Sequence, residues 1–241
     1  MTAERQDIHN SDIPIVCQSC EARHKGVCGA LTPDQLTTLA KQTRKHALAA
    51  GSVLINEAEH LESHSNIIKG VVKLSKMLAD GRQQIVSLQF APDFLGRPLA
   101  DESSMTAEAA SEVSLCSFPK SVLDRLINDS PDLEHRLLQQ ALKELDEARD
   151  WMVTLGRKSA KEKIASFLYL IATHIDPESE EEAVSFSLPL NRADIADFLG
   201  LTTETVSRQM TRLRQDGIIQ IARHREITIT DLDQLMEEAG Y

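Results

Sequence analysis

The sequence predicts an α+β fold in which an antiparallel β-roll is followed by one long helix, further short helices and a C-terminal hairpin. Short apolar runs bounded by glycine occupy residues 45–120, and a heptad-like apolar pattern begins at Pro131. Beyond it, two helical patterns meet at Gly200 and precede a hairpin pattern. The chain has 241 residues, of which 41% are hydrophobic, so it can bury the cores that this arrangement requires.

The charge of the chain is unevenly distributed. The formal net charge of −11 argues against a protein that binds phosphates over its whole surface. Nucleic-acid binding depends on local clusters, however, and arginine is concentrated near the C-terminus. Aromatic residues make up only 4%, which argues against a stacking surface for single-stranded nucleic acid. We therefore expect a basic face on the C-terminal domain, formed by Arg192, Arg208, Arg212, Arg214, Arg223 and Arg225.

No segment indicates export or membrane insertion. The chain contains no apolar run of about 18 residues, and residues 1–14 are polar. We expect a cytoplasmic protein without membrane contact, whose cysteines stay reduced and serve metal binding or redox chemistry. No motif indicates a nucleophile–base pair or a substrate pocket, so we do not expect an enzyme.

Residues 1–30 are polar, rich in cysteine and without clear periodicity. We expect this segment to form an ordered loop only if a bound group joins its cysteines. Cys17, Cys20 and Cys28 have the spacing C-x2-C-x7-C, and Cys116 lies in a later strand pattern. A lone strand cysteine is ordinarily a buried apolar residue. Because the other three lack a fourth partner, Cys116 is also a candidate ligand. Four thiolates suit a tetrahedral zinc site or the corners of a 4Fe-4S cluster, and spacing alone does not choose between them.

Residues 31–128 are predicted to form the β-roll. Thr32 can cap a short helix that ends near Thr43 and has Pro33 at its first position. Asp80-Gly81 separates two of the apolar runs that follow and favours a tight hairpin. Strands at this spacing are typical of a roll or barrel, and the runs are residues 51–55, 66–77, 79–90 and 107–118.

Residues 129–157 are predicted to form one long helix. Apolar residues recur at steps of three or four after Pro131, and no glycine or proline interrupts them before Gly156. Such a seam needs a partner, which is either the β-roll of the same chain or a second copy. We favour a homodimer whose interface contains Leu137, Ala141, Leu145, Ala148, Met152 and Leu155.

Residues 158–241 contain the pattern of a winged helix-turn-helix. A helix from Ser159 to His174 comes first, and Asn191 can then cap a helix that ends at Leu199. Gly200 permits a tight turn into a helix from Thr202 to Gln215, and a hairpin from Ile218 to Thr230 suits the wing.

The second of these helices carries residue types that read DNA bases. Arg208 can bind guanine O6 and N7 together, Glu204 can accept a hydrogen bond from cytosine N4, and Ser207 lies between them. The alternative is a solvent-exposed helix surface on which Glu204 and Arg208, four residues apart, form an ordinary ion pair. Further DNA contacts are expected from Thr202, Thr203, Thr211, Arg212, Arg223 and Arg225.

The run DIADFLGLTTETVSRQMTRLRQDGII closely resembles the DNA-binding signature of the CRP/FNR family of bacterial regulators. The order of the predicted elements also matches that family across nearly the whole chain, with a β-roll similar to cyclic-nucleotide-binding domains. The family's E-x-x-S-R recognition residues fall on Glu204, Ser207 and Arg208, which resembles the FNR branch and its TTGAT-type half-sites. The resemblance implies a homodimeric transcription regulator that binds an inverted-repeat operator in double-stranded DNA and contacts RNA polymerase.

The resemblance also bears on the cysteines. FNR-type oxygen sensors carry three N-terminal cysteines and a remote one on the β domain, which correspond here to Cys17, Cys20, Cys28 and Cys116. It therefore implies one 4Fe-4S cluster per subunit and a response to oxygen, redox state or nitric oxide. The x7 interval is similar to that of alphaproteobacterial homologues, whereas the enteric form has x5. Nucleotide-binding members carry an Arg-Ser pair that the region around Ser103 and Ser104 lacks, so we expect no cyclic nucleotide.

Other functions compete with this interpretation. A regulator of the same family with a zinc site or no metal would take its signal elsewhere, and an iron–sulfur electron-transfer protein would leave the helix-turn-helix unused. The resemblance also implies a carboxylate near the dimer seam that weakens cluster-free dimers. Because this chain has Ala148 at that position, we expect a tighter cluster-free dimer.

Overall fold

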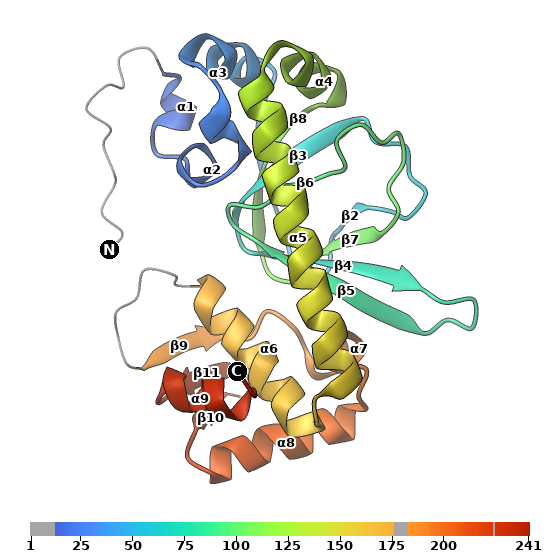
Figure 1. The fold of residues 1–241 in the computed structure, drawn as a ribbon, viewed down its shortest axis with the longest axis vertical. Helices are drawn as coiled ribbons and strands as arrows, with labels where there is room; N and C mark the ends of the chain where they lie inside the picture. Colours follow the sequence, from blue (N-terminus) through green and yellow to red (C-terminus); the bar gives the residue numbers. More distant parts are fainter. Residues whose placement is uncertain (1–12, 176–182, 224) are drawn as a thin grey trace. The chain divides into compact units, whose positions relative to one another are not determined.

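The computed structural model describes residues 13–175, 183–223 and 225–241. The acidic segment at 176–182 and His224 lie outside the described residues. Contacts gather the chain into two compact units, one of residues 1–76 and 88–145 and the other of residues 77–87 and 146–241 (Figure 1). The predicted α+β class is confirmed, while the boundaries of the four predicted domains stay a prediction.

The cysteine-rich arm consists of short helical turns in the first unit. They are α1 (Ile15–Gln18), α2 (Glu21–His24) and a 3-10 turn (Val27–Ala30). The next helix, α3 (Pro33–Ala40), begins as predicted, because Thr32 and Gln35 form a reciprocal capping box.

The β-roll consists of two four-stranded antiparallel sheets. An apolar core that includes Ile67, Val72 and Leu115 holds the roll together. The first sheet has the order β1 (Arg44–Leu48), β8 (Val113–Pro119), β3 (Ser63–Lys69), β6 (Phe94–Leu95). The second has the order β2 (Val53–Ile55), β7 (Thr106–Ala109), β4 (Val71–Met77), β5 (Gln83–Phe90). The predicted hairpin at Asp80-Gly81 is confirmed, since the Leu78 amide donates to the Arg82 carbonyl across it at 2.8 Å.

Gly70 divides the predicted run 66–77 into two strands that belong to different sheets. Its φ is +91°, which side chains disfavour, and a Cβ there would meet the carbonyl oxygen of Glu112. The apolar pattern is continuous through this corner, so the pattern alone does not reveal it.

Gly70→Ala is therefore expected to destabilise the protein by about 1–3 kcal/mol from backbone strain alone, with the clash added to it. Gly51→Ala is the matched control, because Gly51 has a φ of +84° but a methyl group added there would meet no atom within 4 Å. Thermal unfolding of both variants measures the difference, and equal losses would show that the close approach to Glu112 has no weight.

Two helices follow the roll. The first, α4 (Lys120–Asp129), was not predicted, and α5 (Pro131–Arg157) agrees with the predicted long helix. The first turns of α5 pack on the arm, because Leu133 is fully buried in one core with Val27 and Cys28. Arg136 also donates from Nη2 to the Lys25 carbonyl at 2.6 Å.

The second unit holds α6 (Ala160–Ile175), α7 (Arg192–Leu199), α8 (Thr203–Gln215) and α9 (Leu232–Glu238). A three-stranded antiparallel sheet accompanies them in the order β10 (Ile219–Ala222), β11 (Glu226–Ile229), β9 (Val184–Ser187). The hairpin β10–β11 agrees with the predicted wing, whereas β9 and α9 were not predicted. Among the described residues, no helix is long and apolar enough to cross a membrane.

Aromatic rings link the last turns of α5 to this unit. The ring of Trp151 lies 4.5 Å from that of Phe198 on α7, measured between centroids. Phe167 of α6 meets the same Phe198 ring edge-on at 6.0 Å.

Candidate DNA interface and cysteine centre

The turn between α7 and α8 is built by local sequence signals. The Asn191 side chain accepts hydrogen bonds from the backbone amides of Ala193 and Asp194, which starts α7. Gly200 ends it in the left-handed conformation with a φ of +62°, and the Thr202 hydroxyl accepts from the Thr205 amide to start α8. This is the predicted helix-turn-helix geometry.

One face of α8 is buried and the other is open. Val206, Met210 and Leu213 are buried at helical spacing. The residues of α8 that are predicted to contact DNA are all exposed: Thr203, Glu204, Ser207, Arg208, Thr211 and Arg212. The capping residue Thr202, which precedes the helix, is exposed as well. Base contacts by these residues stay a prediction that their position allows.

The charged residues of this face are available to a ligand. Hydrogen bonds from its own backbone amide and from the Thr202 side chain lower the pKa of Glu204, so it is ionised at neutral pH. Within the described part of the chain, neither Glu204 nor Arg208 takes part in an ion pair, which disfavours the ordinary surface pair. Because like charges repel, an ionised Glu204 suits base edges better than phosphates.

The other late arginines fall into two groups. Arg212, Arg214, Arg223 and Arg225 are exposed, and the backbone of Arg223 has a φ of +48° in the wing turn. Arg192 is half-buried instead, and desolvation lowers its pKa. Its inclusion in an open basic face is therefore not supported by its position.

The four cysteines of the chain line one small pocket of about 20 Å³. Its remaining lining is mostly apolar, with Arg23, Asn66 and Thr43 as polar neighbours. Within residues 13–175, 183–223 and 225–241, no group of three or more Cys, His, Asp or Glu side chains is arranged to hold a single metal ion. The structure thus brings together the residues that the sequence singled out, without defining what they bind.

Strand register explains the position of Cys116. Cys116 pairs with Lys45 on one side and with Asn66 on the other. Alternate side chains of a strand point to opposite faces, so these three residues share a face with one another and not with Leu115 in the roll's core. The arm covers that face, because the Asn66 side chain donates to the Cys28 sulfur at 3.2 Å.

The environment of the thiols favours their neutral form. Burial raises the pKa of Cys28 to about 12, and the neighbouring Cys116 adds to the rise. Burial likewise raises the pKa of Cys116 to about 11, with a further contribution from Cys20 and opposition from the Lys45 ammonium group. Metal binding requires thiolates, so binding of a metal here releases protons.

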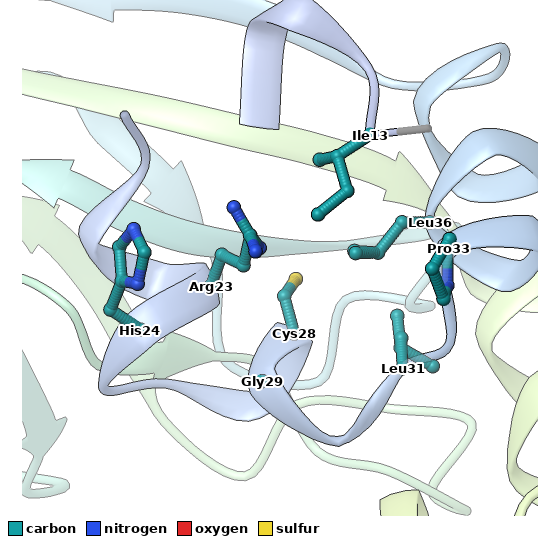
Figure 2. A pocket seen from close by; sticks show the side chains of 8 residues that line it. All are labelled: Ile13, Arg23, His24, Cys28, Gly29, Leu31, Pro33 and Leu36. Carbon is teal, nitrogen blue, oxygen red and sulfur yellow. The ribbon is translucent and has the colours of Figure 1, made fainter. Parts of the chain in front are cut away.

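A second pocket, of about 290 Å³, is also lined by Cys28 (Figure 2). Figure 2 shows the Cys28 sulfur directed into it, with Arg23 and His24 from α2 nearby. Cys28, Arg23 and Leu36 line both pockets.

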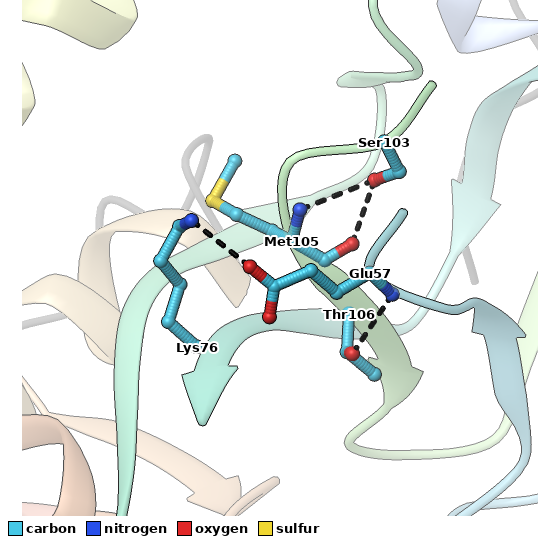
Figure 3. Close-up of polar contacts among 5 residues, drawn as sticks. All are labelled: Glu57, Lys76, Ser103, Met105 and Thr106. Carbon is cyan, nitrogen blue, oxygen red and sulfur yellow. Dashed lines mark hydrogen bonds and ion pairs between the residues drawn. The ribbon is translucent and has the colours of Figure 1, made fainter. Parts of the chain in front are cut away.

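Ser103 and its neighbours, in the region that lacks the Arg-Ser pair, form local polar contacts (Figure 3). The Ser103 hydroxyl donates to the Met105 carbonyl at 2.6 Å and accepts from the Met105 amide. The Glu57 amide donates to the Thr106 hydroxyl, and the Glu57 carboxylate forms an ion pair with Lys76 at 3.0 Å. The expectation that no cyclic nucleotide binds stays a prediction.

The exposed apolar face of α5 differs in part from the predicted seam. Ala141, Leu145, Ala148 and Met152 are exposed, and Met152 leaves 72% of its surface accessible. Leu137 and Leu155 are half-buried, and Leu137 packs against the core that contains Cys28. Leu138 and Leu142, which the sequence analysis did not select, are more than half exposed, at 56% and 52%.

The chain is similar to known regulators over nearly its whole length. Residues 162–238 match the Crp-like helix-turn-helix domain, and residues 45–130 match the cyclic nucleotide-binding domain. A probable transcriptional activator of Rhizobium leguminosarum bv. viciae is 52% identical over 235 residues, which cover 98% of each chain. The transcriptional activator protein FnrL of Cereibacter sphaeroides is 36% identical and covers 93% of this chain and 92% of its own.

A solved structure supports the same assignment. The structure of FixK2 from Bradyrhizobium japonicum has a TM-score of 0.73 and 29% identity, covering 81% of this chain and 96% of that one. The roll, the long helix and the helix-turn-helix of α7 and α8 agree with this likeness. The chain belongs to the CRP/FNR family of transcription regulators.

Proposed function

We propose that this protein is a homodimeric transcriptional activator that senses oxygen, redox state or nitric oxide through a 4Fe-4S cluster and binds TTGAT-type inverted repeats. The observation that carries the sensing part is the convergence of all four cysteines on one pocket in a chain that also exposes Glu204, Ser207 and Arg208. RNA polymerase is the partner through which such an activator acts.

The names of the relatives support this choice. The relatives include a probable transcriptional activator and the activator FnrL, and the Bradyrhizobium diazoefficiens relative is named the nitrogen fixation regulation protein FixK. The relatives therefore indicate a regulator of the FNR or FixK type, and in this proposal the cysteines determine the signal to which it responds.

The donor set fits an iron–sulfur cluster. The pocket is lined by four soft sulfur donors and by no carboxylate or imidazole of the described residues. A cubane offers a separate iron corner to each thiolate, whereas one zinc ion takes all four sulfurs about 2.3 Å from a single point. When bound, a cluster would supply reactivity toward oxygen, and the chain's part is to supply thiolates from the arm and from Cys116 and to shield them from water.

Anaerobic purification with iron, zinc and sulfide analysis tests the proposal. Four-cysteine ligation of a cubane predicts about four irons and four sulfides per subunit. Stoichiometric zinc without sulfide in protein kept free of air would reject the sensing function and favour a zinc-stabilised regulator. An optical spectrum recorded before and after air exposure shows whether the bound group responds.

The exposed stripe of α5 is the proposed dimer contact. Leu138, Leu142, Leu145 and Met152 recur at heptad spacing, and Ala141 and Ala148 flank them. A second copy of the same helix is the occupant that this spacing suits, since a seam of this kind pairs with its like across a two-fold axis.

The carboxylate-free seam leads to a prediction about assembly. Ala148→Asp would set like charges against each other across the two-fold axis, so we expect the variant to dissociate in air while the wild type stays dimeric. Sedimentation of both proteins at micromolar concentration, with and without air, measures the effect. Gln139→Asp adds the same charge about two and a half turns away, on the opposite face of α5, and should behave like the wild type. A wild type that is wholly monomeric in air would contradict the seam argument.

A further inference from the structure

A row of three side chains crosses the first sheet beneath the cysteine arm. Lys45 on β1, Cys116 on β8 and Asn66 on β3 are paired neighbours in register. Each of the two flanking residues forms a hydrogen bond to the arm. The Lys45 ammonium donates to the Val16 carbonyl at 3.0 Å, and the Asn66 amide donates to the Cys28 sulfur at 3.2 Å.

Asn66 is an unusual choice for its position. It lies in the interior of a strand and is only 1% exposed, where asparagine is depleted. Its Oδ1 atom is buried and has no hydrogen-bond partner among the described residues, which costs free energy unless its amide nitrogen compensates. An apolar residue would pack the strand better, so the donor toward Cys28 is the feature that accounts for an asparagine here.

Lys45 acts on the other end of the arm. Val16 belongs to α1 and immediately precedes Cys17, so the bond to its carbonyl fixes the turn that presents this cysteine. Arg44 and Ser63, on the same two strands, line the cavity on the opposite face of the sheet.

We propose that Lys45 and Asn66 are positioning residues that seat the cysteine arm around Cys116, Lys45 by holding α1 and Asn66 by binding the Cys28 sulfur. The seating itself follows from the contacts, while its effect on a bound cluster rests on the proposed function. An ammonium group paired beside Cys116 and an amide donor on the Cys28 sulfur would stabilise the negative charge of these sulfurs once they ligate a cluster, as outer-shell partners do at other metal sites.

The test compares Lys45→Met and Asn66→Leu with the control variants Arg44→Met and Ser63→Ala. Iron loss from the anaerobic holoprotein to a chelator is the first readout. Outer-shell partners are worth about 10–100-fold in metal affinity, so we expect iron loss to be faster by about that factor in the two row variants. The controls should stay within about twofold of the wild type, and Lys45→Arg, which keeps the charge, should recover most of the difference.

Hydrogen–deuterium exchange of the metal-free protein, followed by peptide mass, is the second readout, because it reports on the seating of the arm without depending on thiol ionisation. We expect the backbone amides of α1 to exchange several-fold faster in Lys45→Met and those of the turn Val27–Ala30 several-fold faster in Asn66→Leu. Because Lys45 is exposed, its variant tests the row even where Asn66→Leu fails to fold.

The two readouts separate the two ideas. A wild type without iron and sulfide would reject the cluster, and the hydrogen-exchange rates would then decide the seating alone. Row variants that match the controls in both readouts would overturn the seating while leaving the cluster in place. Faster hydrogen exchange with unchanged iron loss would support the seating and overturn the proposed effect on the cluster.

Discussion

Arg208→Ala should weaken binding to the cognate inverted repeat by about 1–3 kcal/mol, or about 5- to 150-fold, and relax the preference at one guanine of each half-site. The reason is geometric, because Arg208 is exposed near the start of α8 and has no ion-pair partner in the described part of the chain. Binding titrations on the cognate operator and on operators changed at single positions measure both effects. Equal weakening on cognate and random DNA would show that Arg208 contacts only phosphate.

Arg223→Ala is the matched control for this experiment. Arg223 is exposed in the wing turn, where it faces a phosphate backbone in the proposed complex. Its loss should weaken all sequences alike and reduce the slope of log affinity against log salt by about 1. Together the two variants distinguish contacts that recognise the base sequence from contacts that bind the phosphate backbone.

Cys116→Ser should abolish iron and sulfide binding as completely as Cys20→Ser does. Cys116 is 88 residues beyond Cys28 in the sequence but lines the same pocket as the three arm cysteines. A cubane needs a thiolate at each corner, so the loss of the remote ligand is as severe as the loss of a local one. Iron and sulfide analysis of anaerobic protein measures the outcome.

A difference in iron content between the two variants would contradict this prediction. If Cys116→Ser keeps a full set of irons while Cys20→Ser loses them, the fourth ligand comes from elsewhere and Cys116 is an ordinary strand cysteine. Ser117→Ala is a suitable control, because Ser117 is its neighbour on β8 and bonds to the Ser65 hydroxyl at 2.6 Å on the other face.

Local signals predicted most of the C-terminal fold. Asn191, Gly200 and Thr202 each fix one helix end through a short-range hydrogen bond or backbone conformation, so a single sequence is enough to locate them. The sequence did not predict β9, because this strand has only four residues. In the described part of the chain it pairs with β11, which follows both helices of the helix-turn-helix in the sequence.

Long-range packing accounts for what the sequence could not predict. The heptad pattern on α5 does not say which side faces its own chain, so the predicted seam includes the half-buried Leu137 and leaves out the exposed Leu138. Register is equally invisible, because nothing in the strand patterns shows that Lys45 and Asn66 flank Cys116. The four cysteines could be singled out as candidate ligands from the sequence, because their residue type and spacing suggest metal binding whatever the fold.

The contact between Trp151 and Phe198 gives the protein an intrinsic optical reporter. Trp151 is the one tryptophan of the chain, so its fluorescence arises from a single place, the packing of the last turns of α5 on α7. Indole emission shifts to longer wavelength when water replaces apolar neighbours. A change in how the helix-turn-helix is held on α5 is therefore recorded in the emission spectrum without any label.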